Sequence, residues 1–408
     1  MQSKETIDLS PFVEISERRL RHVETAFERS LSHKIRWDSR LIGLRGARGT
    51  GKTTLLLQRM RRETGRSGMA RPLYLSLDNI RFQSVRLEDL VRDFAARGGD
   101  RLFLDEVHRY PEWSRVVKNL YDDYPDLRIV FTGSSLLSLR DGSADLSRRA
   151  VVYNLFGLSF REYLTLKTGV DLPVHPLDEI IRDSVGIASD IVARIKPLAH
   201  FGDYLRNGYY PFFLEGTEDY AMKIEEILAF VLEVELPQLR GVAVEAIPKL
   251  RKLLLAVAES APFVPNVSRL AERIGIGRNT LVEYFGHLGD AALLSLLYRD
   301  AMGVSRLSKP DKVYLENPNL GVLLGGESAS IGALRETFLL GQLSAAGHRV
   351  EYPETGDFRV DGKWLIEVGG TRKGKRQLGA VPNGIVAVDG IEIGSSPRIP
   401  LWLFGFLS

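Results

Sequence analysis

The 408-residue chain contains no cysteine. This absence excludes disulfides, thiolate zinc sites and cysteine catalysis, and it agrees with a reducing compartment. No run approaches the roughly 18 apolar residues that a membrane span needs, and the first residues lack the apolar segment of a secretory signal. We therefore expect a cytoplasmic protein with no membrane partner.

An excess of charge of one sign is also lacking. The chain has 55 Lys and Arg against 52 Asp and Glu, a formal net charge of +3. Charge alone therefore does not make the whole molecule a polyanion binder, and any contact with DNA would have to come from local basic patches. The length predicts two to three domains, at roughly 150 residues per domain.

The pattern of apolar residues divides the chain into four parts. Residues 1–40 are charged with scattered apolar positions, which predicts an N-terminal lead-in helix. Short apolar runs alternate with longer periodic stretches over residues 41–165, which predicts βαβ units and a parallel sheet. Residues 166–310 have helical spacing, and residues 311–408 return to mixed structure with a strand-rich end. The fold class is predicted to be α/β.

A phosphate-binding loop is predicted where the first strand meets the first long helix. The segment GARGTGKT satisfies G-x-x-x-x-G-K-[ST] in full. Its glycines let successive N–H groups point into one concavity, and the helix adds its positive end. Lys52 is expected to reach the β- and γ-phosphates of ATP, and the Thr53 hydroxyl to bind Mg²⁺. The nucleotide-binding set is predicted to be Gly46, Ala47, Arg48, Gly49, Thr50, Gly51, Lys52, Thr53 and Thr54.

Two acids follow a buried strand in the segment RLFLDE. Asp105 has the position of a carboxylate that ligates or orients Mg²⁺, and Glu106 is placed to polarise the attacking water. A second carboxylate favours hydrolysis over storage of the nucleotide. The alternative is a surface acid pair that caps the next helix.

Polar side chains after the next strand are further catalytic candidates. Thr132 and Ser134, in the segment FTGSS, could touch the γ-phosphate or the water, and Ser134 could equally cap a helix. Arg149 could stabilise charge on the γ-phosphate, either in cis or from a neighbouring subunit. The alternative for Arg149 is a solvated surface arginine.

These motifs resemble those of prokaryotic AAA-type P-loop ATPases, in which the ATPase core precedes a winged-helix region and a nuclease-like domain of unknown function. The resemblance covers nearly the whole chain and implies ATP binding. At the arginine position the family has glycine followed by arginine, whereas here Arg148 takes the place of the glycine and Arg149 is the match. The segments that carry the likeness are GARGTGKTT, LFLDE, FTGSS, LFGLSFREYL, YLRNGYYPFFLEG and PLWLFGF.

A helix-turn-helix pattern occupies residues 266–300. A short helix, a Gly275-Ile276-Gly277 turn and a second helix are predicted, and Thr280 and Glu283 are read as a capping box that opens the second helix. The pattern could contact DNA or serve as a structural or protein-contacting element. The basic and polar residues available for DNA are Arg269, Arg273, Arg278 and Asn279.

The C-terminal part contains a predicted hairpin with a type I′ turn at Asp361-Gly362. Its strands could bring together three acids in the manner of a restriction-endonuclease-like site. That pattern wants a lysine two residues after the last acid, where this chain has Gly369. Lys373 or Lys375 could swing in, and nuclease activity is not expected. The acids of this nuclease-like remnant are Glu336, Asp357 and Glu367.

The sequence thus predicts an ATPase that acts as a nucleotide-driven switch. One hypothesis makes it a DNA-associated ATPase. Another makes it a nucleotide-gated protein-interaction module, with a protein partner or a homo-oligomer and no DNA contact, and a third a nuclease-like DNA-processing protein. The Asp105-Glu106 pair suits hydrolysis better than phosphate transfer to a small molecule.

Overall fold

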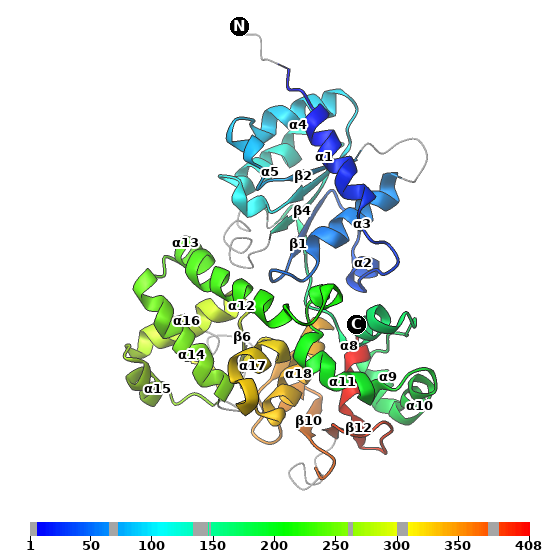
Figure 1. Cartoon of the computed structure of the whole chain (residues 1–408), viewed down its shortest axis with the longest axis vertical. Coiled ribbons are helices and arrows are strands. Elements are labelled where there is room, and N and C mark those ends of the chain that lie inside the picture. The colour runs from blue at the N-terminus through cyan, green and yellow to red at the C-terminus, as the bar shows by residue number, and fades with distance from the viewer. Residues whose placement is uncertain are drawn as a thin grey trace. The chain divides into compact units, whose positions relative to one another are not determined.

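The computed structural model describes residues 6–64, 72–133, 146, 148–259, 264–299, 309–373 and 383–408. The chain forms two compact units, Met1–Phe156 and Gly157–Ser408 (Figure 1). None of the helices within the described residues is both long and apolar enough to cross a lipid bilayer.

The first unit is built on a parallel sheet in the order β2-β3-β4-β1-β5. Four strands lie where apolar runs of the sequence predict them, and the short, largely exposed β5 was not predicted. The four runs are Leu41–Leu44, Leu73–Leu77, Leu102–Leu104 and Ile129–Phe131. All five strands end at one edge, the carboxyl edge, where α/β sheets place their ligands. The strands are β1 (Leu41–Arg45), β2 (Pro72–Ser76), β3 (Arg101–Asp105), β4 (Arg128–Gly133) and β5 (Val151–Asn154).

Helices cover both faces of this sheet (Figure 1). Alternate residues of each strand point to opposite faces, so one core joins the strands to α4 and α5 and the other joins them to α3. The helices of this unit are α1 (Ser10–Arg21), α2 (Leu31–Lys34), α3 (Lys52–Thr64), α4 (Leu87–Ala96) and α5 (Trp113–Asp123).

The expected lead-in helix is present as α1, which packs on β2 and α3, but it ends at Arg21. The chain then runs beside α3 instead of continuing as a helix. The Gln58 amide donates to the carbonyls of Glu24 and Phe27 at 2.7 and 2.8 Å. These bonds fix the segment between α1 and α2 against α3.

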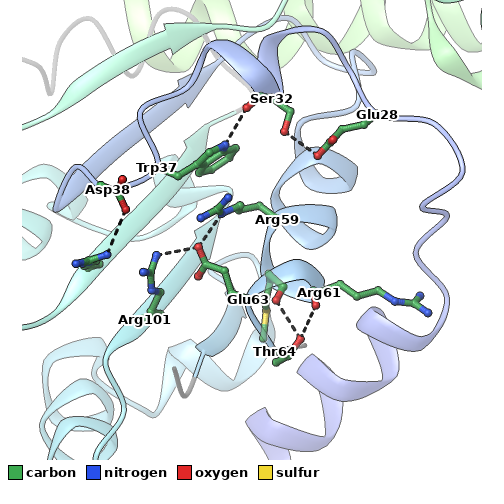
Figure 2. A network of polar contacts seen from close by, with 11 residues as sticks. Glu28, Ser32, Trp37, Asp38, Arg59, Arg61, Glu63, Thr64 and Arg101 are labelled. Atoms are coloured by element: carbon green, nitrogen blue, oxygen red, sulfur yellow. Dashed lines mark hydrogen bonds and ion pairs between the residues drawn. The ribbon is translucent and has the colours of Figure 1, made fainter. Parts of the chain in front are cut away.

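A polar network holds the C-terminal half of α3 (Figure 2). The Glu63 carboxylate accepts from Arg59 at 2.7 Å and from Arg101 at 2.8 Å. The Arg59 guanidinium lies 4.8 Å from the ring centroid of Trp37, whose indole N–H donates to the Ser32 carbonyl. The C-terminal half of α3 is therefore tied to the start of β3 and to the chain before β1.

The second unit begins with helices and ends with a small sheet. Its first helices are α8 (Phe160–Thr168), α9 (Leu177–Arg182), α10 (Ser184–Arg194), α11 (Pro197–Asn207), α12 (Tyr220–Phe230), α13 (Leu236–Arg240) and α14 (Ile247–Glu259). They are followed by α15 (Val267–Ile274), α16 (Arg278–Asp290), the antiparallel pair β6 (Leu294–Leu297) and β7 (Lys312–Leu315), α17 (Pro318–Gly325) and α18 (Ile331–Ala345).

The final sheet has the order β12-β11-β10-β9-β8. Its strands are β8 (Val350–Glu351), β9 (Phe358–Val360), β10 (Trp364–Gly369), β11 (Gly384–Val388) and β12 (Arg398–Pro400). The segment 157–165, predicted to end the ATPase core, lies in this unit and contacts the C-terminal end: the Ser159 hydroxyl and the Arg161 guanidinium donate to the Ser408 carbonyl at 2.8 and 3.0 Å. The mixed α/β class with a parallel central sheet, a helical region and a small C-terminal sheet is as predicted.

Two local predictions in the second unit have different outcomes. The hairpin turn is confirmed: Asp361 and Gly362 have φ of 52° and 69°, as a type I′ turn requires, and the Lys363 N–H donates to the Val360 carbonyl. The capping box is wrong. Helix α16 begins at Arg278 after an extended Gly277, so Thr280 lies within the first turn and caps nothing.

Candidate functional site

The loop between β1 and α3 can form only with glycine at particular positions. Gly49 and Gly51 have φ of 82° and 93°, a region that side chains strain. At Gly46 the constraint is space, because an added Cβ would lie 2.2 Å from the Leu155 carbonyl oxygen. The glycine pattern of the predicted loop therefore has a structural reason at each of these positions.

Lys52, the first residue of α3, is 5% exposed and points back over the loop. Its ammonium donates to the carbonyls of Gly46 and Ala47, both at 2.9 Å. The Thr50 hydroxyl also donates to the Ala47 carbonyl, at 2.9 Å. These bonds hold a positive charge at the loop. Arg48 lies exposed on the loop and Thr54 exposed in the first turn of α3.

Three hydroxyl groups from three elements converge on the Asp105 carboxylate at the end of β3. Thr53 in α3 donates to Oδ2 at 2.7 Å, and Tyr74 in β2 donates to the same oxygen at 2.9 Å. Thr132, at the end of β4, donates to Oδ1. The two residues predicted to hold Mg²⁺, Thr53 and Asp105, are thus in direct contact at the carboxyl edge, where Asp105 is 2% exposed.

Thr132, predicted to touch the γ-phosphate or the attacking water, lies at the end of β4. It is fully buried, and its hydroxyl binds Asp105. This geometry makes Thr132 a residue that orients the carboxylate. Ser134, the other candidate at this position, lies outside the described residues.

Glu106 has a strained backbone. Its φ of 54° and ψ of 41° lie in the left-handed region, which costs a non-glycine residue of order 1–3 kcal/mol. Its Oε2 lies 3.5 Å from Nδ1 of His108. Strain of this kind persists only where the surroundings impose it, and it is common at functional sites.

His108 was missed by sequence reasoning, because a lone histidine after two acids carries no motif. Burial, together with the positive charges of Arg109, Lys52 and Arg48, lowers the pKa of His108 to about 4. Its imidazole is therefore neutral at pH 7. It places an uncharged polar ring beside Glu106 and close to the charge of Lys52.

Arg149 does not lie at the loop. It precedes β5, whose first residue pairs with Ile42 near the start of β1, so Arg149 is at the opposite edge of the sheet. Its guanidinium binds Asp122 through two bonds of 2.9 and 3.0 Å. The expected role in cis is therefore corrected, because the sheet separates Arg149 from the loop of its own chain. A role toward a neighbouring subunit stays a prediction.

A cavity of about 370 Å³ opens beside the first turns of α3. Thr53 and Thr54 form one side of it, and the basic residues Arg18, Arg19 and His22 at the end of α1 form the other. Sequence reasoning missed this wall, because α1 precedes the loop by some thirty residues and carries no nucleotide-binding motif.

A second charged cluster lies in the second unit. Lys312 is 2% exposed, and its ammonium binds Glu336 at 2.9 Å and Asp357 at 3.5 Å. The Tyr314 hydroxyl donates to Glu336 at 2.7 Å. Burial and the charge of Asp357 raise the pKa of Glu336. Two of the three predicted acids thus share one buried lysine.

The third acid, Glu367, binds Lys373 at 2.5 Å. The lysine stem crosses Gly369, where an added Cβ would lie 2.6 Å from Cβ and Cγ of Lys373. Lys373 therefore swings in as considered above, and Lys375 lies outside the described residues. Within those described parts of the chain, no three His, Asp or Glu side chains are arranged to hold a metal ion together.

One comparison with known proteins matches most of the first unit and the start of the second. Residues 38–164 match the model of a family described as the AAA domain. The chain contains an AAA domain. This domain is of the nucleotide-binding P-loop ATPase type, and its match spans the loop, the Asp105 cluster and the sheet that positions them.

The chain also resembles individual proteins. It is 28% identical over 389 residues to the uncharacterized protein MJ1637 of Methanocaldococcus jannaschii, covering 88% of this chain and 81% of that one.

Among solved structures it is similar to PCH-2 of C. elegans, at 19% identity and a TM-score of 0.25, covering 61% of each chain, so it spans less than two thirds of PCH-2. It is similar to AMPPCP-bound DnaA of Aquifex aeolicus, at 15% identity and a TM-score of 0.25, covering 68% of this chain and 86% of that one. It is also similar to the Hsp104–ADP complex of S. cerevisiae, at 14% identity and a TM-score of 0.29. This match covers 70% of this chain and 39% of the Hsp104 chain.

Proposed function

We propose that the AAA domain binds ATP with Mg²⁺ and hydrolyses it, and that the bound nucleotide acts as a switch. The observation that carries this proposal is the 2.7 Å hydrogen bond between Thr53 and Asp105, beside a glycine loop that holds Lys52. A phosphate cradle and a pair of metal ligands are together at one edge of the sheet.

The ligands fit Mg²⁺. A hydroxyl and a carboxylate are hard oxygen donors, and Mg²⁺ usually takes one or two protein ligands and completes its shell with phosphates and water. Once bound, the ion neutralises charge that develops on the phosphates. Tyr74 and Thr132 hold the carboxylate in place from two sides, so Asp105 need not reorient when the ligands assemble.

Glu106 supports hydrolysis over simple storage of the nucleotide. It follows Asp105 directly and is held in a strained conformation, with its carboxylate beside the neutral ring of His108. A carboxylate next to a metal site can orient a water for attack on the γ-phosphate and accept its proton.

The cavity between α1 and α3 is the proposed place for the part of the nucleotide that lies beyond the loop. It begins at Thr53 and Thr54, the residues that follow the phosphate-binding lysine. Arg18 and Arg19 line it together with one carboxylate, Glu24, so the cationic side chains outnumber the acid and suit an anionic ligand.

Calorimetric titration with ATP and Mg²⁺ tests the site. Lys52→Ala removes the ammonium at the loop and is expected to abolish binding. Lys118→Ala, in α5 of the same unit, is the matched control and should bind as the unaltered protein does. An unchanged ATP affinity in Lys52→Ala would remove the loop from the proposal.

Association with DNA is the second candidate function. Helices α15 and α16 lie in the segment where the helix-turn-helix pattern is predicted, and Arg278 and Asn279 are exposed at the start of α16. Arg269 is also exposed, whereas Arg273 lies 3.6 Å from Glu259. ATP turnover measured with duplex DNA across a salt series tests this role, because phosphate contacts make binding salt-dependent. Assembly that depends on ATP and ignores DNA would instead favour the protein-interaction module.

Nuclease activity is not proposed for the C-terminal sheet. Lys312 binds both Glu336 and Asp357, so a side-chain cation lies where a metal ion would be needed. Cleavage of DNA that required Mg²⁺ and vanished in Glu367→Ala would contradict this assignment.

A further inference from the structure

Arg29 lies between α1 and α2, outside every motif of the AAA domain. It is 8% exposed, although it is an arginine in a non-helical segment. Its Nη1 donates to the Thr50 carbonyl at 2.8 Å, and its Nη2 donates to the Phe156 carbonyl at 2.9 Å. One side chain therefore connects the phosphate loop to the last residue of the first unit.

The guanidinium is a planar fork whose two terminal nitrogens keep a fixed separation. A buried cation is costly unless its N–H groups stay bonded. If the Thr50 carbonyl moves, Arg29 must therefore move with it or give up a buried hydrogen bond. The same holds at the Phe156 carbonyl, so the positions of these two carbonyls are coupled.

A second contact joins the same two segments without Arg29. The Leu155 carbonyl oxygen lies so close to Gly46 that an added Cβ would be 2.2 Å away. The Leu155 N–H also donates to the Arg45 carbonyl at 2.7 Å. The segment Leu155–Phe156 thus contacts the start of the loop directly and the Thr50 peptide through Arg29.

The residue after Phe156, Gly157, is the first residue of the second unit. Gly157 is packed inside the second unit, where an added Cβ would lie 2.4 Å from the ring of Tyr209. The Leu158 N–H donates to the Tyr209 carbonyl at 2.7 Å. One peptide bond therefore separates a carbonyl fixed in the first unit from a residue fixed in the second.

We propose that Arg29 is a positioning residue that transmits the nucleotide state of the loop to the Phe156–Gly157 junction. The proposal rests on the proposed ATP binding at this loop. Phosphates that bind the loop N–H groups fix the Thr50 peptide. The Arg29 fork then fixes the Phe156 carbonyl, and loss of the phosphates releases both.

Hydrogen exchange tests this coupling. Exchange of a peptide covering residues 152–160 is measured with and without a saturating non-hydrolysable ATP analogue. In the unaltered chain the analogue is expected to slow exchange about fivefold, the factor that one net hydrogen bond supplies. Arg29→Met has no donor for either carbonyl, so it should bind the analogue and lose most of this slowing. Arg29→Lys keeps the charge and loses the planar fork, so it should keep a smaller part of the response than the unaltered chain.

Arg40→Met is the matched control. Arg40 also donates to two backbone carbonyls of the first unit, those of Tyr121 and Tyr124 at 2.7 and 3.1 Å, but neither belongs to the loop. In Arg40→Met the ATP analogue should still slow hydrogen exchange of residues 152–160 as it does in the unaltered chain. The proposal is overturned if Arg29→Met keeps the full response, or if Arg40→Met loses it equally.

Failure of the coupling and failure of the proposed function give different results. If the unaltered chain does not bind the analogue, ATP binding itself is wrong. If it binds the analogue and exchange at the junction does not change, only the role of Arg29 is overturned. Lys52→Ala should lose both binding and response.

Discussion

The Thr53 hydroxyl donates a 2.7 Å hydrogen bond to Asp105, 52 positions later in the chain. This bond joins the helix that follows the loop to the end of a strand, and β4 lies between that strand and β1 in the sheet. It is strengthened by the charge on Asp105. The relationship places the residues that would hold phosphate and metal in one site.

The hydroxyls of Tyr74 and Thr132 are expected to act through Asp105. Tyr74→Phe and Thr132→Val each remove one donor, which should reduce Mg²⁺-dependent ATP turnover by about 10- to 100-fold, as loss of groups that orient a metal ligand does. ATP binding without Mg²⁺ should change little. Turnover measured against Mg²⁺ concentration gives the comparison. Tyr110→Phe, which removes a hydroxyl bonded to the Leu87 N–H, is the control.

Replacement of Glu106 should separate binding from hydrolysis. Glu106→Gln keeps the size of the side chain and removes the base, so ATP affinity should persist while turnover falls by about 100-fold or more. Glu112→Gln is a close control, since Glu112 also has a positive φ, of 50°. Single-turnover measurements would show the difference, and normal turnover in Glu106→Gln would remove the carboxylate from the reaction.

His108 should make the first unit less stable in acid. Its pKa is lowered from 6.5 to about 4, so in that pH window the unfolded chain takes up a proton that the folded chain refuses. Stability is therefore fully present above pH 6.5 and is lost as pH falls toward 4, by up to about 3 kcal/mol. Denaturant unfolding across this range should show a shallower loss in His108→Gln, and parallel curves for the two proteins would contradict the assignment.

Lys312 should be critical for the stability of the second unit. Lys312→Met leaves Glu336 and Asp357 without their buried cation, and breaking one partner of a buried pair costs about 3–5 kcal/mol. Lys363→Met, which breaks the exposed pair with Asp178, should cost at most about 1 kcal/mol. Urea unfolding followed by circular dichroism compares the two. If the two variants lost the same free energy of unfolding, the buried ion pairs of Lys312 would stabilise the fold no more than the exposed pair does.

Local pattern was enough to predict the loop, Asp105 and four strands of the central sheet. These features depend on residues that are near one another in sequence. The spacing of the glycines, lysine and threonine from Gly46 to Thr53 is specific to phosphate-binding loops. Strand β5 was missed because its residues are largely exposed and carry no apolar run. The start of α16 was misplaced because an extended Gly277, with no side chain to signal a cap, begins the helix earlier.

The supporting residues of the site could not be found in the same way. Tyr74 and Arg29 act by contacts across 31 and 127 positions. An arginine that binds two backbone carbonyls requires no particular residue type at the other end, so the sequence carries no paired signal. Such contacts follow from the packing of the sheet and become visible only in three dimensions.

The left-handed backbone at Glu106 lowers the stability of the folded chain, while the Glu106 carboxylate is the group proposed to act in hydrolysis. A glycine at position 106 would adopt the same conformation without strain, so Glu106→Gly should unfold at a higher temperature while lacking the carboxylate. Laboratory evolution that selected for thermal tolerance alone would then drift toward an inactive protein at this position. A search for more heat-stable variants of this protein should therefore hold residue 106 constant.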